Sequence, residues 1–154
     1  MIQRIQTVYL LVIAILMIVT LFSPLATLVI GGQVCTFDAT GLSTTLTEKP
    51  ELLFPTWGLF VLSGVIALIA MVTIFLYRKR ILQIRLSVFN GLLMLGFYGL
   101  FIYYMSTIGA GGEQMNYSLK IALGLPLVCL ILDYLAIRNI GADEILVRSL
   151  DRLR

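Results

Sequence analysis

Histidine is absent from this sequence of 154 residues, and the only cysteines are Cys35 and Cys129. Without histidine the chain lacks the usual protein ligand of haem, copper, non-haem iron and most zinc sites. Two cysteines are too few for a four-thiolate metal site or for a disulfide framework. We therefore expect neither a bound metal nor another cofactor.

Charged residues are scarce as well. Eleven basic and eight acidic residues make up 12% of the chain, whereas 60% of the residues are hydrophobic. The mean hydropathy is +1.02. A soluble domain contains about twice this charged fraction, because its surface must interact with water. The composition therefore indicates that lipid is the solvent for most of the protein.

Long apolar segments support this interpretation. A membrane-spanning helix needs about 20 consecutive apolar residues, and four segments meet this requirement: residues 8–30, 57–77, 86–104 and 118–137. The first is longer than the core of a signal peptide and lacks an A-x-A cleavage pattern, so we expect an anchor. We predict an all-α fold, in which residues 1–140 form a four-helix transmembrane bundle and residues 141–154 form a separate tail.

The basic residues predict how the chain is threaded. Nine of the eleven fall on one side of the predicted spans: Arg4, Arg78, Lys79, Arg80, Arg85, Arg138, Arg148, Arg152 and Arg154. Lysine and arginine accumulate on the cytoplasmic side of membrane proteins. Both termini are therefore expected in the cytoplasm, and Lys49 and Lys120 on the outside.

The first outer loop, residues 31–54, is predicted to contain a little β-structure. Val34, Thr36 and Asp38 alternate with Gln33, Cys35 and Phe37 after a pair of glycines. This period of two, with its β-branched residues, favours a small β-hairpin on the membrane surface.

Two polar residues fall inside the predicted spans. Asn90 and Asp133 each lie five residues from a basic residue, Arg85 and Arg138 respectively, and therefore at matching depth on antiparallel helices. We expect them to form a polar clamp, a hydrogen bond that fixes the register of the two helices. The alternatives are a proton or ion relay with Asp133 as the titrating group, and pairing of Asp133 with the arginines of the middle link.

The tail has the pattern of a short amphipathic helix. Ala142, Leu146 and Leu150 recur on one face, and Glu144 precedes Arg148 by four residues. Such a helix suits a surface of anionic lipid headgroups or a protein or RNA partner. With the middle link it forms a predicted basic docking surface, whose residues are Arg78, Lys79, Arg80, Arg85, Arg148, Arg152 and Arg154.

The two ends of the chain also carry a resemblance. The opening MIQRIQT (residues 1–7), Asp143-Glu144 and the closing VRSLDRLR (residues 147–154) resemble an uncharacterised family of four-span membrane proteins from Bacteroidota, a domain of unknown function. This resemblance covers the whole chain and implies the inner membrane of a Gram-negative cell, with no established activity. The predicted topology, with a larger first outer loop, is also similar to that of claudin-like proteins, which carries no information on role.

No nucleotide-binding loop, nucleophile elbow or metalloprotease motif occurs in the sequence. We therefore expect a non-enzymatic protein, an accessory subunit of a larger inner-membrane complex. Its expected partners are the bilayer and membrane-protein subunits, for example those of protein translocation or membrane-protein insertion. Contact with a ribosome or RNA at the cytoplasmic face fits the basic surface, and DNA is not expected. The alternative is a small transporter or channel that uses Asn90 and Asp133.

Overall fold

A computed structural model describes residues 2–44, 52–110 and 115–151 of the chain. Within these residues it contains four long helices and a five-stranded sheet. The helices are α1 (Ile2–Phe22), α2 (Trp57–Phe75), α3 (Arg80–Gly109) and α4 (Leu125–Asp151), and a 3-10 turn, η1 (Ile121–Gly124), precedes α4. All four are long and apolar enough to cross a membrane.

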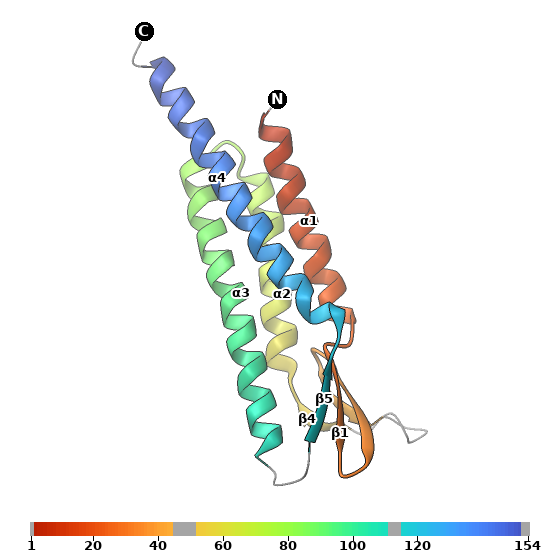
Figure 1. Ribbon diagram of the computed structural model, residues 1–154. Coiled ribbons are helices and arrows are strands. Elements are labelled where there is room, and N and C mark those ends of the chain that lie inside the picture. Colours follow the sequence, from red (N-terminus) through yellow and green to blue (C-terminus); the bar gives the residue numbers. More distant parts are fainter. Residues whose placement is uncertain (1, 45–51, 111–114, 152–154) are drawn as a thin grey trace.

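The helices form an antiparallel bundle (Figure 1). α1 packs against α2 and α4, and α3 packs against the same two helices. The ends of α1 and α4 that lie nearest the two termini are at one end of the bundle, and the sheet is at the other (Figure 1). We call these the termini end and the sheet end.

The sheet corrects the predicted all-α fold. Its strands are β1 (Ala26–Ile30), β2 (Gln33–Phe37), β3 (Gly41–Thr44), β4 (Leu52–Pro55) and β5 (Met115–Leu119). Their order is β4-β3-β2-β1-β5, and each neighbouring pair is antiparallel. The predicted hairpin is therefore one part of a larger sheet that draws strands from both connecting segments of this end.

Local chemistry explains why the first predicted span is divided. Pro24 has no backbone N–H and restrains Ser23 to extended backbone, so a helix cannot continue through this pair. α1 accordingly ends at Phe22, and residues 26–30 form β1 instead of continuing the helix. Gly31 and Gly32 then adopt φ values of 57° and 82°, the left-handed backbone that a two-residue hairpin turn requires.

The fourth span is also shorter at its beginning than expected. Residues 115–119 pair with β1 as strand β5, with Ala26 opposite Leu119. α4 begins after η1 with Leu125-Pro126, and a proline in the first turn of a helix breaks no intrahelical hydrogen bond. At its other end α4 runs through Gly141 to Asp151, so the tail continues this helix and does not form a separate one.

Candidate functional site

Two neighbouring features at the termini end carry the polar chemistry of the bundle. The first is a cluster of buried polar side chains between α3 and α4. The second is a groove lined by basic residues, where the link between α2 and α3 meets the end of α4.

The buried cluster consists of Ser87 and Asn90 on α3 and Asp133 on α4. Asn90 and Asp133 are each 1% exposed, and Ser87 is fully buried. The spacing of residues 83, 87, 90 and 94 places Ser87 and Asn90 on the inward face of α3. The structure therefore brings both predicted clamp residues into the core at the same end of the bundle.

Several polar atoms of this cluster lack a hydrogen-bond partner of good geometry in the part of the chain that the structure describes. Within the described residues no hydrogen-bond partner is found for Ser87 Oγ, for Asn90 Nδ2 and Oδ1, or for Asp133 Oδ1. Asn90 and Asp133 therefore do not form the direct hydrogen bond of the predicted clamp in this arrangement. An unpaired buried polar atom lowers the free energy of unfolding. The cluster therefore either binds a ligand or reduces the stability of the bundle.

Gly91 makes room for the Asp133 carboxyl group. A Cβ atom added at Gly91 would lie 3.1 Å from Asp133 Oδ2, closer than an ordinary contact. Together these two residues line a groove of about 460 Å³ between α3 and α4, whose other lining residues are apolar except for Arg85 and Tyr134. We call it the lateral groove. Gly91 lies four residues after Ser87, and small residues at this spacing let two helices approach closely.

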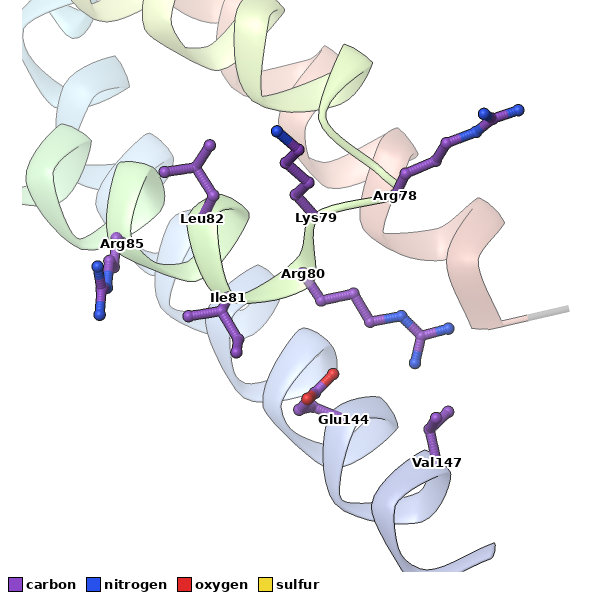
Figure 2. A pocket seen from close by; sticks show the side chains of 8 residues that line it. All are labelled: Arg78, Lys79, Arg80, Ile81, Leu82, Arg85, Glu144 and Val147. Carbon is purple, nitrogen blue, oxygen red and sulfur yellow. The ribbon is translucent and has the colours of Figure 1, made fainter. Parts of the chain in front are cut away.

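The basic groove has a volume of about 630 Å³. Figure 2 shows its lining: Arg78, Lys79, Arg80, Ile81, Leu82 and Arg85 from the α2–α3 link and the start of α3, and Glu144 and Val147 from α4. The four basic residues are those predicted from the middle link. Of the predicted tail residues, Arg148 lies on α4, whereas Arg152 and Arg154 lie outside the described residues.

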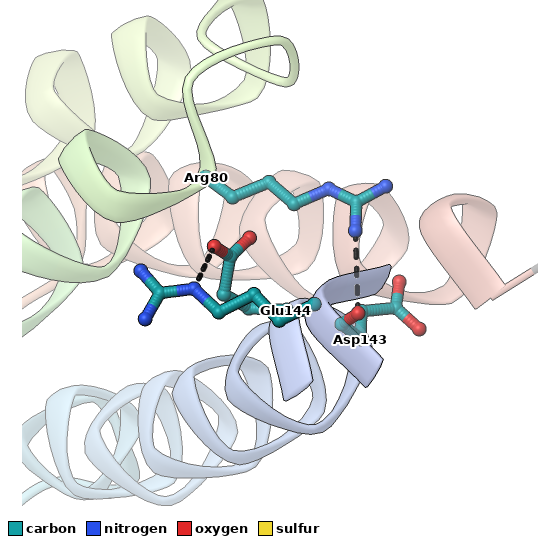
Figure 3. Close-up of polar contacts among 4 residues, drawn as sticks. Arg80, Asp143 and Glu144 are labelled. Carbon is teal, nitrogen blue, oxygen red and sulfur yellow. Dashed lines mark hydrogen bonds and ion pairs between the residues drawn. The ribbon is translucent and has the colours of Figure 1, made fainter. Parts of the chain in front are cut away.

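Hydrogen bonds fix the walls of the basic groove. Arg80 Nη1 donates to the backbone carbonyl of Asp143 on α4 at 3.3 Å (Figure 3). Gln6 Nε2 of α1 donates to Asp143 Oδ2 at 3.1 Å. Arg148 pairs with Glu144 one helical turn earlier, at 3.1 Å between Nε and Oε1. Asp143 therefore joins α1, α3 and α4 at the level where the bundle ends.

Neither feature has the residues of a metal centre. The described part of the chain contains no group of three or more His, Cys, Asp or Glu side chains that could hold a metal ion. Cys35 and Cys129 are both buried as free thiols. The site can bind an anion through the basic residues of the basic groove, and it can form hydrogen bonds through the buried cluster.

One comparison with known proteins identifies a family. The sequence model of a family described as a domain of unknown function (DUF4293) matches residues 2–153, and the chain belongs to this family. This match confirms the predicted resemblance to an uncharacterised family. No curated protein matches the chain significantly.

Proposed function

We propose that this protein is a non-enzymatic subunit of a larger complex in the inner membrane of a bacterium, and that it binds its partner at the termini end. The observation that carries the proposal is the part of α4 beyond Asp143. The side chains of Ile145 and Leu150 are 71% and 66% exposed there, beside the cations of the basic groove.

The length of α4 supports a docking role. A helix of 27 residues is about 40 Å long, whereas the hydrocarbon core of a bilayer is about 30 Å thick. Asp143, Glu144 and Arg148 place the surplus at the polar side of the membrane. In Figure 1 this end of α4 extends past the beginning of α1. Exposed apolar side chains among charges, on the part of a helix that extends past its neighbour, are typical of an interaction surface.

The distribution of basic residues supports a cytoplasmic termini end. Arg78, Lys79, Arg80 and Arg85 lie at this end with Arg148, which is the bias that sets orientation in membrane proteins. This can be tested with a single cysteine at Arg78 or at Thr40, both exposed, in a chain with Cys35→Ala and Cys129→Ala. In intact spheroplasts an impermeant maleimide is expected to label Thr40→Cys and not Arg78→Cys. The reverse labelling would overturn this orientation.

Affinity purification of the full-length protein from its own membranes in mild detergent tests the partner. We expect a stoichiometric partner with the wild type and loss of that partner with Ile145→Glu/Leu150→Glu. Tyr117→Glu, an exposed position on β5 at the sheet end, is the matched control and should retain the partner. A translocation or insertion component, or a ribosome released by nuclease, would identify the class of complex.

Two outcomes contradict the proposal. Recovery of the wild-type protein without any stoichiometric partner would argue against a complex subunit. Retention of the partner by Ile145→Glu/Leu150→Glu together with its loss from Tyr117→Glu would move the docking surface to the sheet end.

A small transporter or channel is the second candidate, because Asn90 and Asp133 lie unpaired in the core. The inward face of α3 continues toward the sheet end with Met94, Phe97 and Phe101, all buried. A polar path along α3 therefore does not continue beyond Asn90, which favours the subunit. Loss of an ion or solute flux in Asp133→Asn would reverse this preference.

A further inference from the structure

The basic groove and the lateral groove are two parts of one continuous surface, because Arg85 lines both of them. Arg85 lies in the second turn of α3, between the cations of the α2–α3 link and the apolar residues of the next turns. In Figure 2, Arg80 points toward α4, whereas Arg85 lies on the other side of Ile81. A molecule that contacts Arg85 is thus positioned to enter both grooves.

The basic part has positive charge without matching acids. Glu144 is the one acidic residue in its described lining, and Arg148 already pairs with it. No ion pair joins Lys79 or Arg85 to any carboxylate within the part of the chain described here. Cations at the edge of a membrane bind the phosphates of lipid headgroups, and Arg does so with parallel hydrogen bonds.

The lateral part is suited to a hydrocarbon chain. Val88, Leu92 and Leu95 of α3 line it and are more than half exposed, so the groove faces outward, where the membrane would be. Leu130 and Ile137 line it from α4. A groove of this kind between two spanning helices is filled by the apolar chain of a lipid when no protein covers it.

The lateral groove also contains one buried carboxyl group, below its apolar rim. Asp133 lines the lateral groove, is 1% exposed, and carries the unpartnered Oδ1 described above. It faces Gly91, which is six residues beyond Arg85 and therefore about 9 Å deeper along α3. In a lipid, the ester, amide or hydroxyl groups that join the headgroup to the chains also lie just below the phosphate.

We propose that the joined grooves bind one phosphate-headed lipid of the membrane. Arg85, which lines both grooves, binds its phosphate, a chain lies between α3 and α4, and Asp133 contacts the polar linkage. The proposal is independent of the partner proposed above, because neither groove contains Ile145 or Leu150. A free phosphate would use the basic part alone, and an apolar helix of a partner protein would not use a phosphate-binding site. Because the basic part and the apolar part are joined, they favour a lipid.

Native mass spectrometry of the full-length protein in detergent tests the proposal. The probes are phosphatidic acid, diacylglycerol with the same chains, and inorganic phosphate. We expect retention of phosphatidic acid and not of the other two. Arg85→Gln should weaken this retention about tenfold, the value of one charge-assisted hydrogen bond. Arg138→Gln is the matched control: it removes the same charge from an exposed arginine outside both grooves and should leave retention unchanged.

The lateral groove needs its own variant. Leu92→Trp fills the groove from its exposed rim and should also weaken the retention of phosphatidic acid, whereas Leu68→Trp, at an equally exposed position on α2, should not. Both sites are exposed, so folding is preserved. Asp133→Leu should weaken retention, and Asp133→Asn, which still forms hydrogen bonds, should restore it in part.

Several results would overturn the proposal. Equal retention of diacylglycerol would show that the phosphate is not recognised, and binding of inorganic phosphate alone would reduce the site to a soluble anion. Equal losses of phosphatidic acid retention in Arg85→Gln and Arg138→Gln would show that the lipid responds to the overall positive charge and not to a specific site. Unchanged retention in Leu92→Trp would show that no chain enters the lateral groove. Displacement of the lipid by a copurifying protein helix would assign the groove to that partner.

Discussion

The inward face of α3 changes character along its length. Toward the sheet end it presents Met94, Phe97 and Phe101, and Phe101 meets Phe37 of β2 edge-to-face with ring centroids 5.5 Å apart. Toward the termini end the same face presents Gln83, Ser87 and Asn90. One helix thus supports an apolar, aromatic core at one end and a polar core at the other.

The two ends also differ in how their buried polar groups are hydrogen-bonded. The buried Ser63 and Thr20 donate to backbone carbonyls of their own helices, and Thr56 Oγ1 donates to the carbonyl of Asp38 at 3.0 Å. The Ser87, Asn90 and Asp133 cluster includes atoms that lack a partner within the described residues. The comparison indicates that the sheet end provides stability, while the termini end retains polar groups at a cost in stability, as binding sites do.

The largest effect is expected at the aromatic core. Phe37 is fully buried, so Phe37→Ala removes its packing against Phe101 and leaves a cavity, lowering the free energy of unfolding by about 3–5 kcal/mol. Phe22→Ala, at a position 79% exposed, is the control and should change little. Reversible unfolding in mixed micelles measures both. A loss below that of Phe22→Ala would show that the sheet end is not the stable part.

The next effect concerns the contact that closes the termini end. Gln6 is buried and its Nε2 donates to Asp143 Oδ2. Gln6→Leu should therefore lower the free energy of unfolding by about 1.5–3 kcal/mol, as expected for a hydrogen bond to a carboxylate. Faster hydrogen exchange in residues 143–151 should accompany this loss. Glu144→Gln, which breaks the exposed pair with Arg148, is expected to cost less than about 0.5 kcal/mol. Equal losses would mean that surface charge, and not the buried contact, holds α4.

A pair of substitutions on α3 tests the unsatisfied cluster directly. Asn90→Leu replaces an amide that has no partner within the described residues by an apolar group of similar size, and should raise the free energy of unfolding by about 1 kcal/mol. Gln83→Leu removes a bond from Nε2 to the carbonyl of Thr73, 3.3 Å long, and should lower it by about 1 kcal/mol. The opposite signs are the prediction, measured by the same unfolding assay. If both substitutions lowered the free energy of unfolding, Asn90 would be shown to have a hydrogen-bond partner, as the predicted clamp requires.

The sequence predicted the helices well because each contains a long apolar run. It predicted a small hairpin but not the five-stranded sheet, because β1 is itself apolar and directly follows the run that forms α1. Only Ser23-Pro24 indicated the break. β5 is held by pairing with β1, from Ala26 opposite Leu119, and local patterns carry no information on a partner so distant in the chain.

The candidate site was also predicted only in part, because some of its features depend on contacts between distant segments. Charge alone indicated the basic residues of the middle link, and depth alone indicated Asn90 and Asp133. The space beside Gly91, and the position of Arg85 in both grooves, depend on how α3 packs against α4. Packing of this kind is a property of two helices together and leaves no period in either sequence.

The smallest effect is expected at the sheet end, at one partly buried acid. Burial raises the pKa of Asp38, in the turn between β2 and β3, above its ordinary value. An acid whose pKa is higher in the folded protein stabilises the fold when protonated, below its unfolded pKa, and loses this contribution as the pH rises through the folded pKa. Asp38→Asn should therefore raise the melting temperature slightly at pH 7 relative to the wild type, and the difference should shrink toward pH 4. Thermal melts of both proteins at the two pH values measure this. A melting temperature of Asp38→Asn below that of the wild type at pH 7, with a deficit that shrinks toward pH 4, would mean that a positive group stabilises the charged carboxylate. The sheet end, like the termini end, would then depend on charge.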